Sequence, residues 1–324
     1  METANLYLAG LILTAIAWVS RELWHRRSAK RQSAHDASKI LNERKTLLEE
    51  LISKTQDKLR KNELKTQLDE VNAALLGLQT KRLQQILKDA DLPPEETLIA
   101  NGRKRLQPQQ VNSIKKVIAE LKTLPPFASV QDLLTLGNAY YYAEQYQDAK
   151  DTYDKILNLK PDDPVALCNR GAALVKSKRY KEAIDDFNRS LELKPNDAIT
   201  LGNRGAALAW LGRYKEAIDD FNRSLELKAD TITLGNRGAA LVKLERYKEA
   251  IDDFSRSLKI RPDDPITLYN LSCLFSLWGK TDDALTYLEK ALEKEKKYRE
   301  DAKTDTDFNN IRKDPRFKKL IESD

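Results

Sequence analysis

The chain has 324 residues and a net charge of +6, with only two histidines and two cysteines. These four residues do not occur in the closely spaced pairs that are typical of zinc sites, so the sequence gives no support for a zinc site or a disulfide framework. Charge is uneven, because residues 21–123 carry a net +8 and residues 124–324 a net −1. The basic part mixes both signs and has almost no aromatic residues to stack bases, so nucleic-acid binding is not expected.

Residues 4–20 contain no charged side chain and are rich in Leu, Ile, Ala, Trp and Val. As a helix this segment would span roughly 26 Å, slightly less than the hydrocarbon core of a bilayer. Basic residues follow it directly, beginning at Arg21. The pattern predicts a transmembrane anchor over residues 1–20, with the N-terminus outside and the rest of the chain in the cytoplasm. A cleaved signal peptide and a surface-lying or core helix are the alternatives.

Residues 21–91 predict a basic helical stalk. Apolar residues alternate four and three apart, which is a coiled-coil seam of about two heptads: Leu64, Leu68, Val71, Leu75 and Leu78. This seam predicts a possible homo-oligomer, and a helical hairpin that folds back on itself is the alternative. Basic charge beside an anchor would also attract anionic lipid headgroups.

Residues 92–129 predict a linker with short helices, bounded by the pairs Pro93-Pro94 and Pro125-Pro126. Within it, Val111–Leu121 predicts an amphipathic helix. Because this helix is tethered beside the next region, it is a candidate to occupy any binding groove there.

From residue 130 onward the chain repeats itself. Residues 180–194 recur word for word as residues 214–228 and nearly so from Tyr247. The landmark residues Gly137, Gly171, Gly205, Gly238 and Ser272 lie 34, 34, 33 and 34 residues apart. A period of this length indicates stacked helical hairpins.

Each unit carries small and apolar residues at helical spacing, such as Leu167, Gly171 and Leu174 on one helix and Ala183 and Phe187 on the next. These landmarks resemble the tetratricopeptide repeat (TPR) family. The resemblance implies an all-α fold, a right-handed superhelix of five repeats, followed by a C-terminal cap at residues 299–324 of a kind found in bacterial TPR proteins. The repeats are 130–163, 164–197, 198–230, 231–264 and 265–298. The apolar side of the cap is expected to come from Phe308, Ile311, Phe317, Leu320 and Ile321.

Position 7 of the repeat, usually apolar in the family, is arginine in three repeats. An unpaired buried guanidinium would be very costly. We therefore predict that each arginine pairs with an acid on the second helix of its own repeat, and the alternative is exposed arginines without partners. The expected pairs are Arg170 with Asp186, Arg204 with Asp220, and Arg237 with Asp253.

The TPR resemblance implies a concave groove lined by the first helix of each repeat. Carried onto this sequence, the groove residues include four possible aromatic anchors and a ladder of asparagines that could bond an extended peptide. Some of them could instead pack between repeats. The predicted binding residues are Asn138, Tyr141, Tyr142, Asn169, Val175, Lys176, Asn203, Trp210, Asn236, Val242, Lys243, Tyr269, Asn270 and Leu277.

One TPR subclass binds the C-terminal carboxylate of chaperones through three cations. Here Asn138 and Asn169 match that pattern, but the cationic positions hold Leu134, Ile199 and Asn203. This carboxylate clamp is therefore not expected.

The sequence predicts no enzyme, no catalytic residues, no metal and no cofactor. It predicts a membrane-anchored adaptor or scaffold that binds a protein segment in the TPR groove, as a single-pass protein of a bacterial inner membrane. The alternatives are a targeting or import receptor or co-chaperone on a membrane surface, or a structural membrane organiser that acts through stalk oligomerisation.

Overall fold

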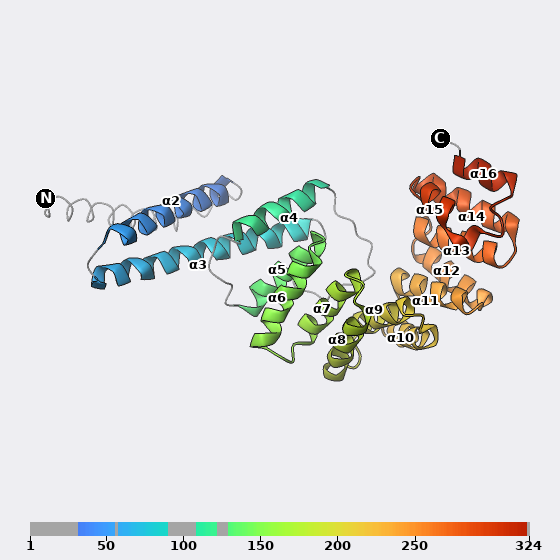
Figure 1. Cartoon of the computed structure of the whole chain (residues 1–324), viewed down its shortest axis with the longest axis horizontal. Helices are drawn as coiled ribbons and strands as arrows, with labels where there is room; N and C mark the ends of the chain where they lie inside the picture. Colours follow the sequence, from blue (N-terminus) through green and yellow to red (C-terminus); the bar gives the residue numbers. More distant parts are fainter. Residues whose placement is uncertain (1–31, 56–57, 90–107, 122–128, 323–324) are drawn as a thin grey trace. The chain divides into compact units, whose positions relative to one another are not determined.

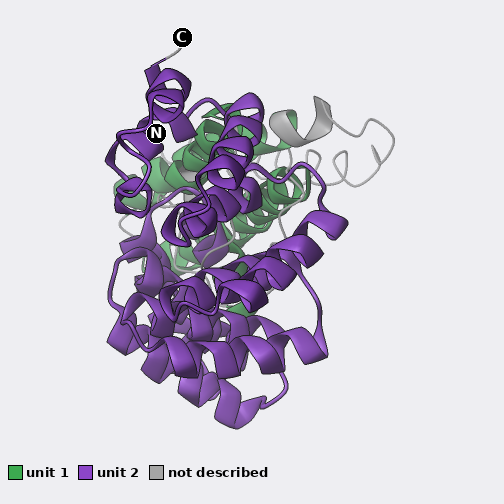
Figure 2. Cartoon of the chain, turned by 90° about the vertical axis from the view of Figure 1, so that its right-hand side faces the viewer, with its two compact units in different colours: residues 1–92, 108–135 green, residues 93–107, 136–324 purple. Residues whose placement is uncertain are grey.

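A computed structural model describes residues 32–55, 58–89, 108–121 and 129–322, and every regular element in these ranges is helical. The chain divides into two compact units, residues 1–92 with 108–135 and residues 93–107 with 136–324 (Figure 2). The all-α prediction is therefore confirmed for the described residues.

The first unit is built around a helical hairpin of α2 (Gln32–Lys54) and α3 (Lys58–Asp89), which pack side by side (Figure 1). Its core consists of Leu48 from α2 with Val71 and Leu75 from α3, and Leu41, Leu64 and Leu68 pack against them. The predicted seam is therefore used within the chain. The structure does not support the coiled-coil interpretation for these residues, because their apolar side chains pack against α2, the preceding helix of the same chain.

The third helix of this unit, α4 (Pro108–Leu121), covers the predicted helix and begins three residues earlier. It packs against α3, and Ile114, Val117 and Ile118 are buried. Its apolar face is thus already covered, and the helix does not fit the role of groove occupant.

The predicted transmembrane helix and single-pass topology require a correction. In the part of the chain that the structure describes, no helix is both long enough and apolar enough to cross a membrane. Residues 1–20, on which the prediction rested, lie outside the described ranges.

Residues 130–294 form five consecutive helical hairpins, of which all but residues 130–135 belong to the second unit. Each second helix packs against the first helix of the next hairpin where contacts are described (Figure 1). The first helices also touch one another, from α7 to α9, α11 and α13. The hairpins are α5 (Val130–Tyr142) with α6 (Tyr146–Leu159), α7 (Pro164–Lys176) with α8 (Tyr180–Leu193), α9 (Ala198–Trp210) with α10 (Tyr214–Leu227), α11 (Thr231–Lys243) with α12 (Tyr247–Ile260), and α13 (Pro265–Leu277) with α14 (Thr281–Lys294).

Glycine at position 8 is required by the close approach of an aromatic ring. A Cβ built on Gly205 would lie 2.7 Å from the Phe221 ring, and the equivalent glycines meet Tyr153, Phe187 and Phe254 at 2.5–2.6 Å. In the fifth repeat Leu288 replaces the ring, and Ser272 at the glycine position donates to the Ala284 carbonyl at 2.7 Å. The residue at the glycine position and the residue that packs against it therefore differ together in the fifth repeat.

The cap follows the last hairpin as α15 (Tyr298–Thr304), the short 3-10 helix η1 (Thr306–Phe308) and α16 (Pro315–Glu322). Four of the five residues expected on its apolar side are buried, and Leu320 is half-buried. Phe308 and Phe317 have ring centroids 5.3 Å apart, and both side chains are fully buried. The cap thus has a small core of its own.

The predicted arginine pairs are confirmed. Arg204 donates from Nε to Asp220 at 2.7 Å and from Nη2 to its other carboxylate oxygen at 2.6 Å, and the other two pairs repeat this two-pronged geometry. The remaining Nη1 donates to the second helix of the preceding repeat. For Arg170, Arg204 and Arg237 these acceptors are Asp154, Asn188 and Asn222, respectively. Each arginine therefore joins two helices of its own repeat and a third from its neighbour.

Replacing Arg204 with leucine should destabilise the array by about 3 kcal/mol, because it leaves the buried Asp220 carboxylate without a cation. Urea unfolding followed by circular dichroism would measure the loss. Arg213, which forms an exposed pair with Glu216, is the matched control, and its replacement by leucine should leave the unfolding midpoint unchanged. Equal shifts for both variants would contradict the proposed importance of the buried pairs.

The turn between the two helices of each repeat needs a residue in the left-handed region. Gly212 and Gly279 occupy it at φ 76° in the third and fifth repeats, whereas Glu144, Lys178 and Glu245 hold φ of 60–62° in the others. An L-residue with a side chain is strained in that region by about 1–2 kcal/mol. Three repeats therefore carry a small local strain that the other two avoid.

Glu245→Gly should raise the free energy of unfolding by about 0.5–1 kcal/mol, since relief of the strain exceeds the entropic cost of glycine. The reciprocal change Gly212→Glu should lower it by a similar amount, because a Cβ there has open space and only the backbone conformation opposes it. Chemical denaturation of both variants tests this. Shifts of the same sign would show that side-chain contacts, not backbone conformation, decide the effect.

Candidate functional site

The predicted groove residues divide into those inside the helix layer and those on its surface. Asn138 and Asn169 are fully buried, and Asn169 donates to Asn138 at 3.0 Å while Tyr153 donates to the same oxygen at 2.7 Å. Asn203 is also buried, with its amide 3.5 Å from Cys168 Sγ. These three asparagines bond helices of neighbouring repeats to each other. The bonds also engage both asparagines that match the carboxylate clamp.

Several apolar members of the predicted set are buried as well. Tyr141 makes edge contacts with Tyr142 and Tyr146, with ring centroids 5.8 and 5.5 Å away. Val175 and Val242 are less than a tenth exposed. These side chains pack inside the layer of helices and present little surface to a partner.

The remaining predicted residues reach the surface. Trp210 is 63% exposed, and its ring stacks nearly parallel on Tyr180 with centroids 5.9 Å apart. Lys243 is exposed, and the half-buried members are Tyr142, Lys176, Asn236, Asn270 and Leu277. We call the surface formed by these seven residues on α5, α7, α9, α11 and α13 the first-helix face.

At the C-terminal end of this face, the cap contacts predicted binding residues. Lys243 donates to both carboxylate oxygens of Asp307, at 3.1 and 3.3 Å, and the Tyr269 hydroxyl donates to Asp305 at 3.0 Å. Burial by itself lowers the pKa of Lys243, but the hydrogen bond to Asp307 and the negative charges of Asp307 and Asp305 together raise that pKa above its usual value. Sequence reasoning missed both aspartates, because they were assigned to a cap and lie some thirty residues or more from their partners.

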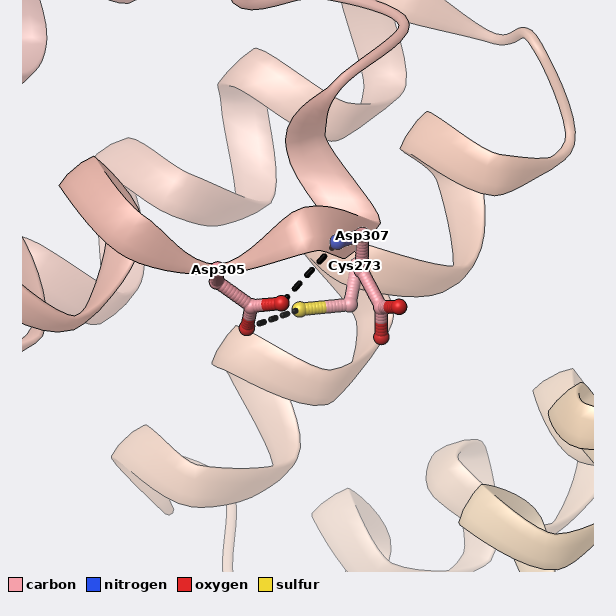
Figure 3. A group of neighbouring side chains, drawn as sticks. All are labelled: Cys273, Asp305 and Asp307. Carbon is pink, nitrogen blue, oxygen red and sulfur yellow. Dashed lines mark hydrogen bonds between the residues drawn. The ribbon is translucent and has the colours of Figure 1, made fainter.

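Cys273 lies beside the same two aspartates (Figure 3). The possible ligand atoms of these three residues fall within 4.8 Å of one another, so they are a candidate cation cluster. Lys243 and Tyr269, however, already bind the two carboxylates. Burial and the nearby aspartates also raise the pKa of the Cys273 thiol well above its usual range, which disfavours the thiolate that a metal would need. Both carboxylates thus already have partners within the protein, and the cluster fits a structural contact better than a metal site.

Both cysteines should react slowly with iodoacetamide in the native protein at pH 8. Burial raises the pKa of Cys168 to about 12, and both thiols are less than a tenth exposed. Only the thiolate is strongly nucleophilic, so labelling should become fast only after unfolding in urea. Mass spectrometry of the labelled peptides gives each rate separately, and rapid native labelling of Cys273 would show that the cap contact opens in solution.

Comparison with known families agrees with this architecture. Models described as tetratricopeptide repeat match residues 130–163, 164–197, 198–230 and 230–294. The chain belongs to the tetratricopeptide repeat family. Members of this family bind peptides and proteins through their repeats. Among curated proteins, no match to the chain was found.

Three solved structures are similar to parts of this chain at low sequence identity. PilW, described as a widely conserved type IV pilus biogenesis factor, is 23% identical, with 52% of this chain and 78% of that chain covered and a TM-score of 0.49. YrrB, a TPR protein with an unusual peptide-binding site, is 24% identical, with 57% and 94% covered and a TM-score of 0.43. A thermophilic TPR protein of Thermus thermophilus, TTC0263, is 21% identical, with 52% and 93% covered and a TM-score of 0.47.

Proposed function

We propose that this TPR protein is an adaptor that binds a segment of a partner protein on its first-helix face. The observation that carries the proposal is Trp210. A tryptophan that is 63% exposed and held flat against Tyr180 presents a large, rigid apolar surface to solvent. Such anchors dominate the binding energy of many protein interfaces.

The neighbourhood of Trp210 supports the same role. Tyr142 and Lys176 lie at the corresponding position of the two preceding repeats, and both are half-buried. Ala239 of the next first helix is exposed, and a Cβ on Gly235 of the same helix would meet nothing within 4 Å. Small residues on α11, the first helix that contacts α9, leave room for the side chains of a bound segment.

Photo-crosslinking in the full-length protein tests this assignment. A photoreactive amino acid at Tyr142 or at Ala239 should capture a partner, whereas one at Lys181, exposed on α8, should not. Trp210→Ala should abolish the capture without unfolding the array, because most of the side chain is outside the core.

Equal capture from Lys181, or capture from Tyr142 that is insensitive to Trp210→Ala, would contradict binding on the first-helix face. Circular dichroism of the alanine variant separates loss of binding from loss of structure.

A further inference from the structure

The Trp210 ring has a counterpart two repeats further along the array. Trp278, the C-cap residue of α13, stacks on Tyr247, the first residue of α12, with ring centroids 5.6 Å apart. Trp210, the last residue of α9, stacks in the same way on Tyr180, the first residue of α8. In both places a tryptophan at the end of a first helix lies on the tyrosine that begins the preceding second helix.

The two stacks differ in what else contacts the tryptophan ring. The side chain of Lys280, two residues after Trp278, places its Nζ 4.0 Å from the centroid of the Trp278 ring. Trp278 is half-buried, whereas Trp210 is 63% exposed. A cation over a tryptophan ring is a favourable contact, because the face of the ring carries negative charge density. The ring in the fifth repeat is therefore covered by the protein's own lysine, and the ring in the third repeat is open.

The third repeat also has a cation at the position of Lys280, but that cation is bound elsewhere. It is Arg213, whose Nε and Nη2 donate to the two carboxylate oxygens of Glu216 at 2.7 and 2.6 Å. Such two-pronged, charge-assisted hydrogen bonds hold a guanidinium in one orientation. In the fifth repeat the position of Glu216 is occupied by Asp283, whose side chain is one methylene shorter. The acid and the place of the cation thus differ together between the two repeats.

We propose that Glu216 is a positioning residue that keeps the Trp210 ring open by holding Arg213 away from it. Without the Glu216 carboxylate, the Arg213 guanidinium lies over the Trp210 ring, as Lys280 lies over Trp278. This inference rests on the proposed adaptor function and names the residue that keeps its anchor accessible to a partner.

The fourth repeat provides a matched control. Arg246 donates to both carboxylate oxygens of Glu249 at 2.7 and 2.6 Å, as Arg213 does to Glu216. The first helix of that repeat, however, ends in Lys243 and not in a tryptophan. Glu249→Gln therefore removes the same charge and the same kind of ion pair as Glu216→Gln, in a repeat that holds no tryptophan.

Hydroxyl-radical footprinting of the full-length protein, analysed by mass spectrometry, gives the oxidation rate of each tryptophan and needs no partner. In the unchanged protein, Trp210 should be oxidised faster than Trp278. Glu216→Gln should lower the Trp210 rate about twofold, because a cation on one ring face shields roughly half of the exposed ring. Arg213→Ala combined with Glu216→Gln should restore the rate, since the covering side chain is gone. Lys280→Ala should raise the Trp278 rate.

Glu249→Gln should leave the Trp210 rate unchanged. The proposal is overturned by an unchanged Trp210 rate in Glu216→Gln, by a lowered rate that the double substitution does not restore, or by an equal fall in Glu249→Gln. An unchanged Trp278 rate in Lys280→Ala would also overturn it, because the fifth repeat would then show no covered ring. Unfolding would raise the rates of both tryptophans, so a fall cannot come from loss of structure.

Photo-crosslinking separates this inference from the adaptor function. Where Arg213 covers the ring, capture from Tyr142 should fall together with the Trp210 oxidation rate, and both should recover in the double variant. If the oxidation rate falls and recovers while capture stays constant, Trp210 is not the anchor. The adaptor assignment then fails, and the positioning role of Glu216 stands.

Discussion

The buried arginine–aspartate pair is the interaction on which the three middle repeats depend. Asp220 and Asp253 are almost completely enclosed, and each receives two hydrogen bonds from one guanidinium. A carboxylate in that position is tolerable only with its cation in place. The same guanidinium also donates a hydrogen bond to the preceding repeat. The arginine that neutralises the buried carboxylate therefore also fixes how two neighbouring repeats stack. The asparagine contacts between first helices and the arrangement of surface residues follow from that geometry.

Much of this fold could be predicted, because the repeat makes its constraints visible several times in one chain. Glycine at one position and a ring at another indicate two helices in close contact, and an arginine in an otherwise apolar position indicates an acid nearby. The arginine pairs were found in this way. The bonds from Arg204 and Arg237 to asparagines of the preceding repeat were missed, because amides carry no charge that calls for a partner.

The errors have physical causes too. A heptad pattern indicates that a helix has an apolar stripe. It does not indicate whether that stripe packs against a second copy of the chain or against another helix of the same chain. In α3 it meets α2, where Leu48 completes the core. Likewise, an asparagine at a repeating position can face a ligand or another asparagine, and burial decides between them. Asn138 and Asn169 are paired inside the helix layer, whereas Trp210 of the same predicted set is on the surface.

The third and fourth repeats contact their preceding repeats through the same kinds of residue, so one repeat could be removed and the next could take its place. Removal of residues 198–230 would connect Asp197 directly to Thr231, and Asp197 would replace Asp230, another aspartate, as the N-cap residue of α11. Arg237 would then meet Asn188 in place of Asn222, a residue of the same kind. These two contacts would be kept after the excision, but Trp210 would be lost. The length of such an array can thus drift in evolution without redesign of its interior, while what it recognises is held in the few side chains by which the repeats differ.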